Sequence, residues 1–189
     1  MKEPALYRVV RPIITILFKL LFRPTIIGSE NIPKKERVVL AGNHTKFLDC
    51  LLLISSTKRT IHFLAKDELI KGPKKIIFKN MGIIPVNRKI HDKNALAEAI
   101  NTLNQDKVIG IFPEGTINRT KDIIMPFKIG AVKMSKETNS NLIPFTIKGK
   151  YKLFRKSIVI EFYKPYKVEN DLTEENEKLM QIIKDNLRK

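Results

Sequence analysis

A histidine and an aspartate, His44 and Asp49, follow a short apolar run at 38–42. Such a run is typical of a buried strand, and functional side chains often lie where a strand ends. Residues five positions apart do not face each other on a continuous helix, so we expect His44 in the turn and Asp49 in the first turn of the next helix. There the carboxylate can accept the proton of one imidazole nitrogen, which leaves the other nitrogen to deprotonate a hydroxyl group. The pair predicts general-base chemistry, and the alternative is a helix cap beside two ordinary exposed side chains.

A second candidate site follows the strand-like run 108–112. It is the turn Pro113-Glu114-Gly115-Thr116, in which proline and glycine favour a tight bend. A turn with exposed N–H groups, a threonine hydroxyl and nearby cations, here Arg119 and Lys121, can bind an oxyanion or a phosphate. The alternative is a surface turn with solvated charges.

Cys50 raises the alternative of covalent catalysis through a cysteine. It begins the apolar run 50–54, where a cysteine is usually a small buried hydrophobic residue, and its sequence neighbours give no reason for a lowered pKa. We therefore expect no nucleophilic role for it. The three histidines, His44, His62 and His91, lack the spacing of metal ligands, so we expect no metal site.

Strand-like runs alternate with helical patterns along the rest of the chain. The strand-like runs lie at 37–41, 60–65, 83–86, 108–112, 142–148 and 157–162. The helical patterns lie at 67–80, 92–104, 129–139 and from 171 to the C-terminus. This alternation predicts an α/β fold with a mixed, largely parallel central sheet of about seven strands covered by helices.

The N-terminal stretch 9–22 is almost entirely apolar from Ile13 onward and is bounded by basic residues. It is shorter than the ~20 apolar residues of a membrane-spanning helix, and no small-residue cleavage site of an export signal follows it. Pro12 should break or kink a helix continuing from Leu6, or start a new one as its first residue, which predicts two short helices. These helices either pack on the domain or enter a bilayer interface.

The chain carries a large excess of positive charge. There are 36 Lys and Arg against 19 Asp and Glu, a formal net charge of +17 at pH 7. Such a charge attracts nucleic acid, an anionic bilayer, an acidic carrier protein or a phosphorylated substrate. Nucleic acid is disfavoured because the chain has no Trp, shows no reader motif and spreads its lysines along every segment. The single cysteine excludes an internal disulfide framework.

Four segments, in order, resemble the lysophosphatidic acid acyltransferases of the glycerolipid acyltransferase superfamily. They are Asn43-His44 with Asp49; Gly82-Ile83-Ile84-Pro85-Val86-Asn87-Arg88; Phe112-Pro113-Glu114-Gly115-Thr116; and Leu142-Ile143-Pro144-Phe145. Each segment alone is a weak signal. Four of them in the family's order span most of the chain and are specific.

The resemblance implies a role for each matching residue. His44 would be the general base and Asp49 its orienting partner. Glu114, Gly115 and Thr116 would shape the binding site of the acyl acceptor.

The resemblance also implies a phosphate site. Arg88 would bind the acceptor phosphate, and Lys66 and Arg119 are similar to further basic positions that contact this phosphate in the family. The family usually has Arg directly after the threonine of the third segment, where this chain has Ile117. Arg119 therefore either matches a second basic position or replaces the missing one.

The implied reaction transfers an acyl group from a thioester of acyl carrier protein or coenzyme A to the sn-2 hydroxyl of lysophosphatidic acid. The product is phosphatidic acid for phospholipid biosynthesis, and the reaction needs no cofactor. A lipid substrate favours membrane association for the helices of 1–23, with 24–189 as the acyltransferase domain at the cytoplasmic face of the membrane. The alternatives are another acceptor, such as glycerol phosphate or a different lysolipid, a basic nucleic-acid-binding protein, and an inactive membrane scaffold.

Overall fold

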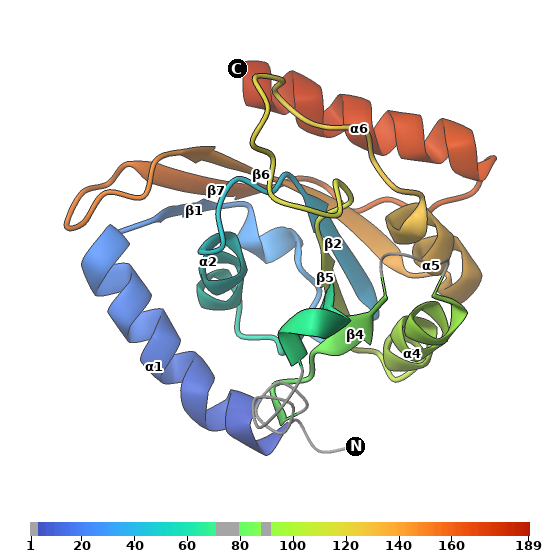
Figure 1. Ribbon diagram of the computed structural model, residues 1–189, viewed down its shortest axis with the longest axis horizontal. Helices are drawn as coiled ribbons and strands as arrows, with labels where there is room; N and C mark the ends of the chain where they lie inside the picture. Colours follow the sequence, from blue (N-terminus) through green and yellow to red (C-terminus); the bar gives the residue numbers. More distant parts are fainter. Residues whose placement is uncertain (1–3, 71–79, 88–91) are drawn as a thin grey trace.

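A seven-stranded sheet forms the centre of the molecule in the computed structural model (Figure 1). The structure describes residues 4–70, 80–87 and 92–189. The strands are β1 (Thr25–Ile27), β2 (Val38–Gly42), β3 (Ile61–Lys66), β4 (Ile84–Val86), β5 (Val108–Ile111), β6 (Asn141–Gly149) and β7 (Ile158–Phe162), in the order β1-β7-β6-β2-β5-β3-β4. β6 and β7 pair antiparallel, and the other strand pairs between described residues are parallel. The predicted fold class is confirmed.

Helices cover both faces of this sheet (Figure 1). α1 (Ala5–Phe22) and α2 (Asp49–Ser56) bury their apolar residues against one face. α4 (Lys93–Leu103), α5 (Gly130–Thr138) and α6 (Leu172–Arg188) bury theirs against the other. Two short 3-10 helices, η1 (Ser29–Asn31) and η2 (Asp67–Ile70), lie in the connections.

β2 is a central strand with both faces covered, and every residue of its sequence VVLAG is buried. Val38 and Leu40 belong to the core under α1 and α2, whereas Val39 and Ala41 belong to the core on the other face. This is the two-residue period of a strand. At the end of the strand, a Cβ on Gly42 would lie 2.4 Å from the ring of Phe145. Glycine therefore lets this aromatic ring pack directly on the strand end.

Each predicted strand is present within about two residues of its expected bounds. β1 was not predicted, because it has three residues and is held by its parallel pairing with β7. Of the helix expected at 67–80, the described residues show η2 and, at Asn80, one helical residue, and 71–79 lie outside the described residues.

The prediction of two N-terminal helices was wrong, because α1 is one helix of 18 residues with Pro12 inside it. Proline costs about 3 kcal/mol inside a helix. Tyr7 and Phe18 lie on either side of Pro12, and both are buried in the same core. The Tyr7 hydroxyl also accepts a 3.1 Å hydrogen bond from the backbone N–H of Ile61. Packing on both sides of the proline offsets its local cost and keeps the helix continuous.

The opposite side of α1 exposes a second apolar stripe. Val9, Ile13, Ile16, Leu17 and Leu20 are each more than half exposed, and on a helix these positions fall within an arc of about 100°. Among the described residues, no helix combines the length and apolarity needed to cross a membrane.

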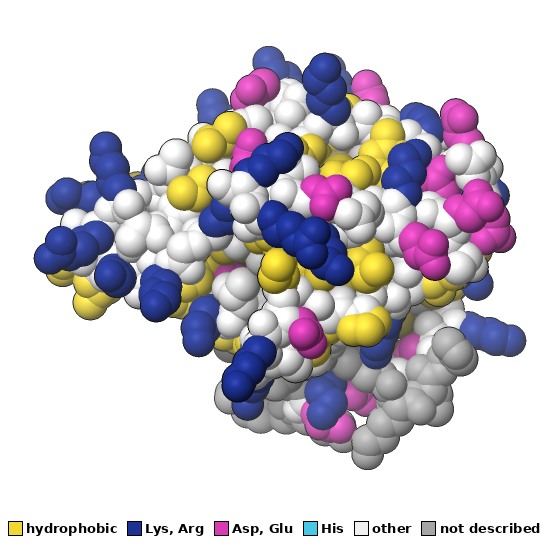
Figure 2. Space-filling view, turned by 90° about the horizontal axis from the view of Figure 1, so that it is seen from above, with side chains coloured by type: hydrophobic (Ala, Val, Ile, Leu, Met, Phe, Trp, Pro, Cys, Tyr) yellow, Lys and Arg dark blue, Asp and Glu magenta, His cyan; other side chains and the backbone are white. Residues whose placement is uncertain are grey.

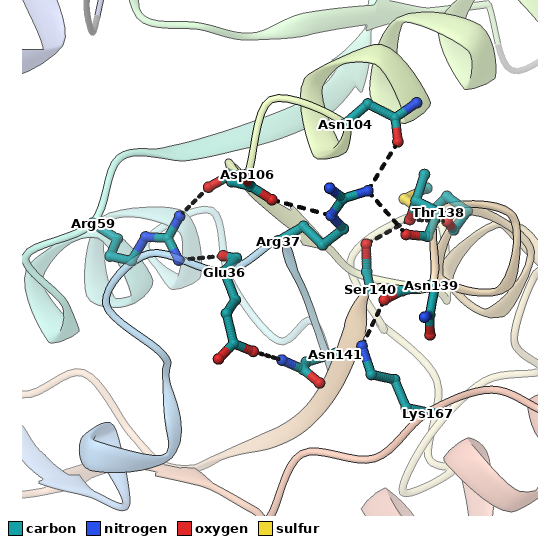
Figure 3. A network of polar contacts seen from close by, with 11 residues as sticks. Glu36, Arg37, Arg59, Asn104, Asp106, Thr138, Asn139, Ser140, Asn141 and Lys167 are labelled. Carbon is teal, nitrogen blue, oxygen red and sulfur yellow. Dashed lines mark hydrogen bonds and ion pairs between the residues drawn. The ribbon is translucent and has the colours of Figure 1, made fainter.

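A polar network ties together the amino-terminal ends of the central strands (Figure 3). Arg37, just before β2, donates hydrogen bonds to Asp106 Oδ1 at 3.1 Å and to the carbonyl oxygen of Thr138 at 3.2 Å. Arg59 donates to the carbonyl oxygens of Glu36 and Asp106, both at 2.5 Å. The network links the segments that lead into β2, β3, β5 and β6, and so stiffens the edge of the sheet opposite their carboxyl ends.

Candidate active site

The carboxyl ends of four adjacent parallel strands, β2, β5, β3 and β4, meet at one edge of the sheet. His44 follows β2, the turn at Pro113 follows β5, and Lys66 ends β3. Ligands bind at this edge in open α/β sheets. The topology therefore brings the predicted site residues of separate segments to one place.

His44 and Asp49 form a hydrogen-bonded pair there, with 2.9 Å between His44 Nδ1 and Asp49 Oδ2. Asp49 is the first residue of α2 and its side chain is completely buried, whereas 14% of the His44 side chain remains exposed. A carboxylate beside Nδ1 favours the tautomer with its proton on that nitrogen, which leaves the lone pair of Nε2 for another group. The structure thus brings together the two residues that the sequence pointed to, in the arrangement of a base and its orienting partner.

Further donors fix the orientation of the Asp49 carboxylate. The backbone N–H groups of Thr45 and Lys46 donate to Oδ2 at 2.5 and 2.7 Å, and the Tyr151 hydroxyl donates to Oδ1 at 2.6 Å. Tyr151 comes from the hairpin between β6 and β7, and sequence reasoning missed it. Its pKa is raised, first by burial and then by the charge of Asp49, so the hydroxyl remains a donor at neutral pH.

Phe112 holds the ring of His44, and Asn43 holds the backbone just before it. The imidazole stacks on the ring of Phe112 with 4.0 Å between centroids and 13° between planes. The preceding residue, Asn43, is buried and pairs with the backbone of Ile147 in β6: Nδ2 donates to its carbonyl at 3.0 Å, and Oδ1 accepts from its N–H at 2.8 Å. These contacts fix the chain direction on leaving β2 and limit the imidazole to one orientation.

Glu114 joins the two loops of the site. Its Oε1 accepts from the backbone N–H of His44 at 2.8 Å and its Oε2 from that of Met125 at 2.9 Å. Burial raises the pKa of Glu114 above its ordinary value, although both hydrogen bonds oppose this shift. The carboxylate is therefore placed to hold the turn beside His44, and any direct contact with an acceptor stays a prediction.

Gly115 makes the tight turn after β5 possible. Its φ of 73° lies in the left-handed region that side chains disfavour, and its N–H donates to the carbonyl of Phe112 at 2.9 Å. A Cβ at this position would also lie 2.9 Å from Cε of Lys128. Thr116 follows with an exposed side chain, so the turn presents polar groups at the edge of the site.

Of the three predicted phosphate-binding cations, the structure describes Lys66 and Arg119. Lys66 is at the end of β3, partly exposed and ion-paired with Glu68. Arg119 is exposed in the loop that is anchored to the site by a 2.8 Å hydrogen bond from the N–H of Asn118 to the carbonyl of His44. Arg88 lies outside the described residues. The structure therefore brings Arg119 near the His44 loop and puts Lys66 at the same edge of the sheet.

Cys50 lies directly after Asp49 in α2, but its chemistry differs from that of a nucleophile. Burial, and then the neighbouring charge of Asp49, raise the pKa of its thiol to about 12. Only a thiolate attacks a thioester efficiently. Among residues 4–70, 80–87 and 92–189, no group of three or more His, Cys, Asp or Glu side chains is arranged to hold a metal ion.

Comparisons with known proteins find relatives that match most of this chain. Residues 23–148 match the sequence model of the family described as Acyltransferase. A 1-acyl-sn-glycerol-3-phosphate acyltransferase of Borreliella burgdorferi is 39% identical over 137 residues, which are 71% of this chain and 54% of that protein. The protein of the same name from Bacillus subtilis is 29% identical over 126 residues, 66% of this chain and 62% of that protein. The chain thus spans about half to two thirds of the length of these relatives.

A solved structure shares the fold. The crystal structure of the 1-acyl-sn-glycerophosphate acyltransferase PlsC from Thermotoga maritima superimposes with a TM-score of 0.74. The match covers 97% of this chain and 77% of the other at 23% sequence identity.

Proposed function

Because the chain belongs to the acyltransferase family, we propose that it transfers an acyl group from an acyl thioester to the sn-2 hydroxyl of lysophosphatidic acid, giving phosphatidic acid for phospholipid biosynthesis. The observation that carries this proposal is the 2.9 Å pairing of His44 with Asp49 at the carboxyl edge of the sheet. The names of the relatives support the choice of acceptor.

In the proposed reaction, Nε2 of His44 takes the proton of the acceptor hydroxyl as its oxygen attacks the thioester carbonyl. Asp49 stabilises the imidazolium that forms, through the hydrogen bond at Nδ1. When the tetrahedral intermediate collapses, the carbon–sulfur bond breaks and the imidazolium returns its proton to the leaving thiolate. The products are the acylated acceptor and the free thiol, so the reaction balances without a cofactor. The acyl donor is a thioester of either acyl carrier protein or coenzyme A.

The acceptor would be held by its phosphate. Lys66, Arg88 and Arg119 are the proposed cations, because fixed positive charges beside the base both bind the head group and align its hydroxyl. Glu114 and Gly115 would shape this region through the turn that they hold.

A lipid acceptor requires access to a bilayer. We propose that residues 1–23 associate with the cytoplasmic face of the membrane and that residues 24–189 carry the reaction. The exposed stripe of α1 supports this, since five large apolar side chains on one helix face, with Arg8 and Lys19 exposed at its side, are typical of a helix that lies in a membrane interface.

The decisive experiment supplies the purified protein with lysophosphatidic acid and a labelled acyl thioester and looks for labelled phosphatidic acid. Parallel reactions with glycerol 3-phosphate and with lysophosphatidylcholine test the alternative acceptors, and matched acyl carrier protein and coenzyme A thioesters test the donor. Labelled product with lysophosphatidic acid alone supports the proposal. Transfer only to another acceptor would support the proposed acyl transfer but contradict lysophosphatidic acid as the acceptor. No transfer to any acceptor would overturn both the reaction and the acceptor.

A further inference from the structure

The hairpin between β6 and β7 presents apolar side chains to solvent beside cations. Leu153 and Phe154 are 58% and 61% exposed. The connection 150–157 also contains Lys150, Lys152, Arg155 and Lys156, and it has no Asp or Glu. At the left end of both views, where this hairpin protrudes, Figure 2 shows several Lys and Arg side chains, with apolar side chains beside them at the lower margin. Exposed apolar residues ringed by cations match the interface of an anionic bilayer.

The backbone holds Phe154 outward at a conformational cost. Its φ is 59°, in the left-handed region that a bulky side chain rarely adopts. In this conformation its N–H donates at 2.5 Å to the carbonyl oxygen of Leu21. Leu21 lies in the last turn of α1, where carbonyls have no partner within the helix. The hairpin thus caps α1 and places its own apolar tip at the end of that helix.

The two apolar surfaces therefore lie next to each other. Leu20, in the exposed stripe of α1, immediately precedes Leu21, to which the hairpin is bonded. The ring of Tyr151 fixes the same junction from inside, edge-on to Phe18 and Phe22 at centroid distances of 6.0 and 5.6 Å. β6 runs parallel to β2, so the hairpin leaves the sheet at the edge that carries His44.

We propose that the tip of the β6–β7 hairpin, Leu153 and Phe154 with their flanking cations, is a second membrane-contacting element that inserts into an anionic lipid surface beside α1. It extends the membrane association proposed above for residues 1–23 to a segment more than 120 positions away in the sequence. With α1 and the hairpin both on the bilayer, two contacts instead of one fix how the site edge faces the lipid.

The chain contains no Trp, so one introduced Trp reports on its own surroundings. Phe154→Trp is the probe, and Ile123→Trp is the matched control, since Ile123 is also exposed but lies in the cleft lined by Met180 and Lys184 of α6. Vesicles of phosphatidylcholine with phosphatidylglycerol should shift the emission of Phe154→Trp to shorter wavelength, and brominated lipids should quench it. Neither change is expected for Ile123→Trp.

Binding itself is measured by sedimentation with the same vesicles. Leu153→Ser with Phe154→Ser, and separately Lys152→Gln, Arg155→Gln and Lys156→Gln, should each weaken partitioning about tenfold or more. Lys133→Gln, Lys136→Gln and Lys189→Gln remove the same charge from the α5–α6 side and should have much less effect.

Each other outcome overturns the proposal. If the protein sediments but Phe154→Trp is neither shifted nor quenched, the hairpin does not touch lipid and another surface binds the vesicles. Equal losses of vesicle binding in the two charge variants would mean that net charge alone attracts the protein. An emission shift that grows with protein concentration in the absence of vesicles would mean contact between copies of the chain. Failure of the unaltered protein to bind vesicles would overturn the proposed membrane contacts of both the hairpin and α1. Acyl transfer is measured separately, so its absence would count against the proposed reaction and not against this surface.

Discussion

The hydroxyl of Tyr151 donates a 2.6 Å hydrogen bond to Asp49 Oδ1, across 102 positions of sequence. The same carboxylate accepts a hydrogen bond from His44 Nδ1 through its other oxygen. Tyr151 therefore acts on the proposed base only through Asp49, as a positioning residue, and it connects the base to the hairpin and to α1.

Tyr151→Phe should lower kcat about five- to thirtyfold with little change in KM, because a charge-assisted hydrogen bond contributes about 1–2 kcal/mol. Because Tyr151 orients the base only through Asp49, the loss should appear in kcat and leave the KM of both substrates nearly unchanged. Tyr163→Phe is the control, since Tyr163 also donates to a carboxylate, that of Glu161, at 3.0 Å but on β7. An unchanged kcat in folded Tyr151→Phe would leave Tyr151 with a structural role only.

His44→Ala should lower acyl transfer by about 10²–10⁴-fold, the usual contribution of general-base catalysis. It should leave the circular dichroism spectrum and vesicle binding unchanged, because His44 belongs to neither core. Substantial turnover by a folded His44→Ala protein would remove this residue from the mechanism.

Asp49→Asn should be nearly as inactive and also less stable. In the unaltered protein, both oxygens of the Asp49 carboxylate accept hydrogen bonds from Thr45, Lys46, His44 and Tyr151. The NH₂ group of an asparagine would face at least one of these donors instead of accepting from it. A buried donor left without an acceptor costs about 1–3 kcal/mol. Urea unfolding and the melting temperature measure this loss, and a variant as stable as the unaltered protein would contradict the network.

Cys50→Ser should retain nearly full acyl transfer at neutral pH. The thiol has a pKa raised to about 12 in the folded chain, against about 8.5 when unfolded. Its stabilising effect is therefore present below about pH 8.5 and is lost as the pH rises toward 12, since the unfolded chain then releases the proton first. Urea unfolding of both proteins at about pH 8 and pH 10 checks this. The free energy of unfolding should fall more between these two pH values for the unaltered protein than for Cys50→Ser. A large loss of activity in folded Cys50→Ser would instead support covalent catalysis.

Arg119→Ala should raise the KM for lysophosphatidic acid about tenfold, as expected from one charge-assisted contact of about 1.5 kcal/mol. The KM for a monoacylglycerol, which lacks the phosphate, should not change. Lys58→Ala removes an exposed charge just before β3, at the opposite edge of the sheet, and serves as the control. Arg88→Ala should behave like Arg119→Ala, and equal effects on both acceptors would exclude a phosphate contact.

The sequence was informative where the signal is local. His44 and Asp49 are separated by one turn, and the apolar run of β2 indicates where that turn begins. Tyr151 gave no such signal, because a lone tyrosine in a lysine-rich connection reaches Asp49 only after β6 has been placed beside β2. β1 was missed for the same reason, since three residues become a strand by pairing with β7. The prediction of two helices at Pro12 was wrong because the cost of proline in a helix is local, whereas the packing of Tyr7 and Phe18 that offsets it is tertiary.

The continuous α1 also decides how its membrane contact must be tested. Deleting residues 1–22 would remove Tyr7 and Phe18 from the core, so lost vesicle binding would be indistinguishable from unfolding. Ile16→Ser with Leu20→Ser changes only the exposed stripe, where each residue is 60% exposed. Each apolar side chain contributes up to about 2 kcal/mol when it leaves water, so partitioning onto phosphatidylcholine–phosphatidylglycerol vesicles should fall about a hundredfold while the melting temperature stays unchanged. Ile123→Ser, on the α6 side, should bind normally, and a double variant that binds like the unaltered protein would show that this stripe does not meet the bilayer.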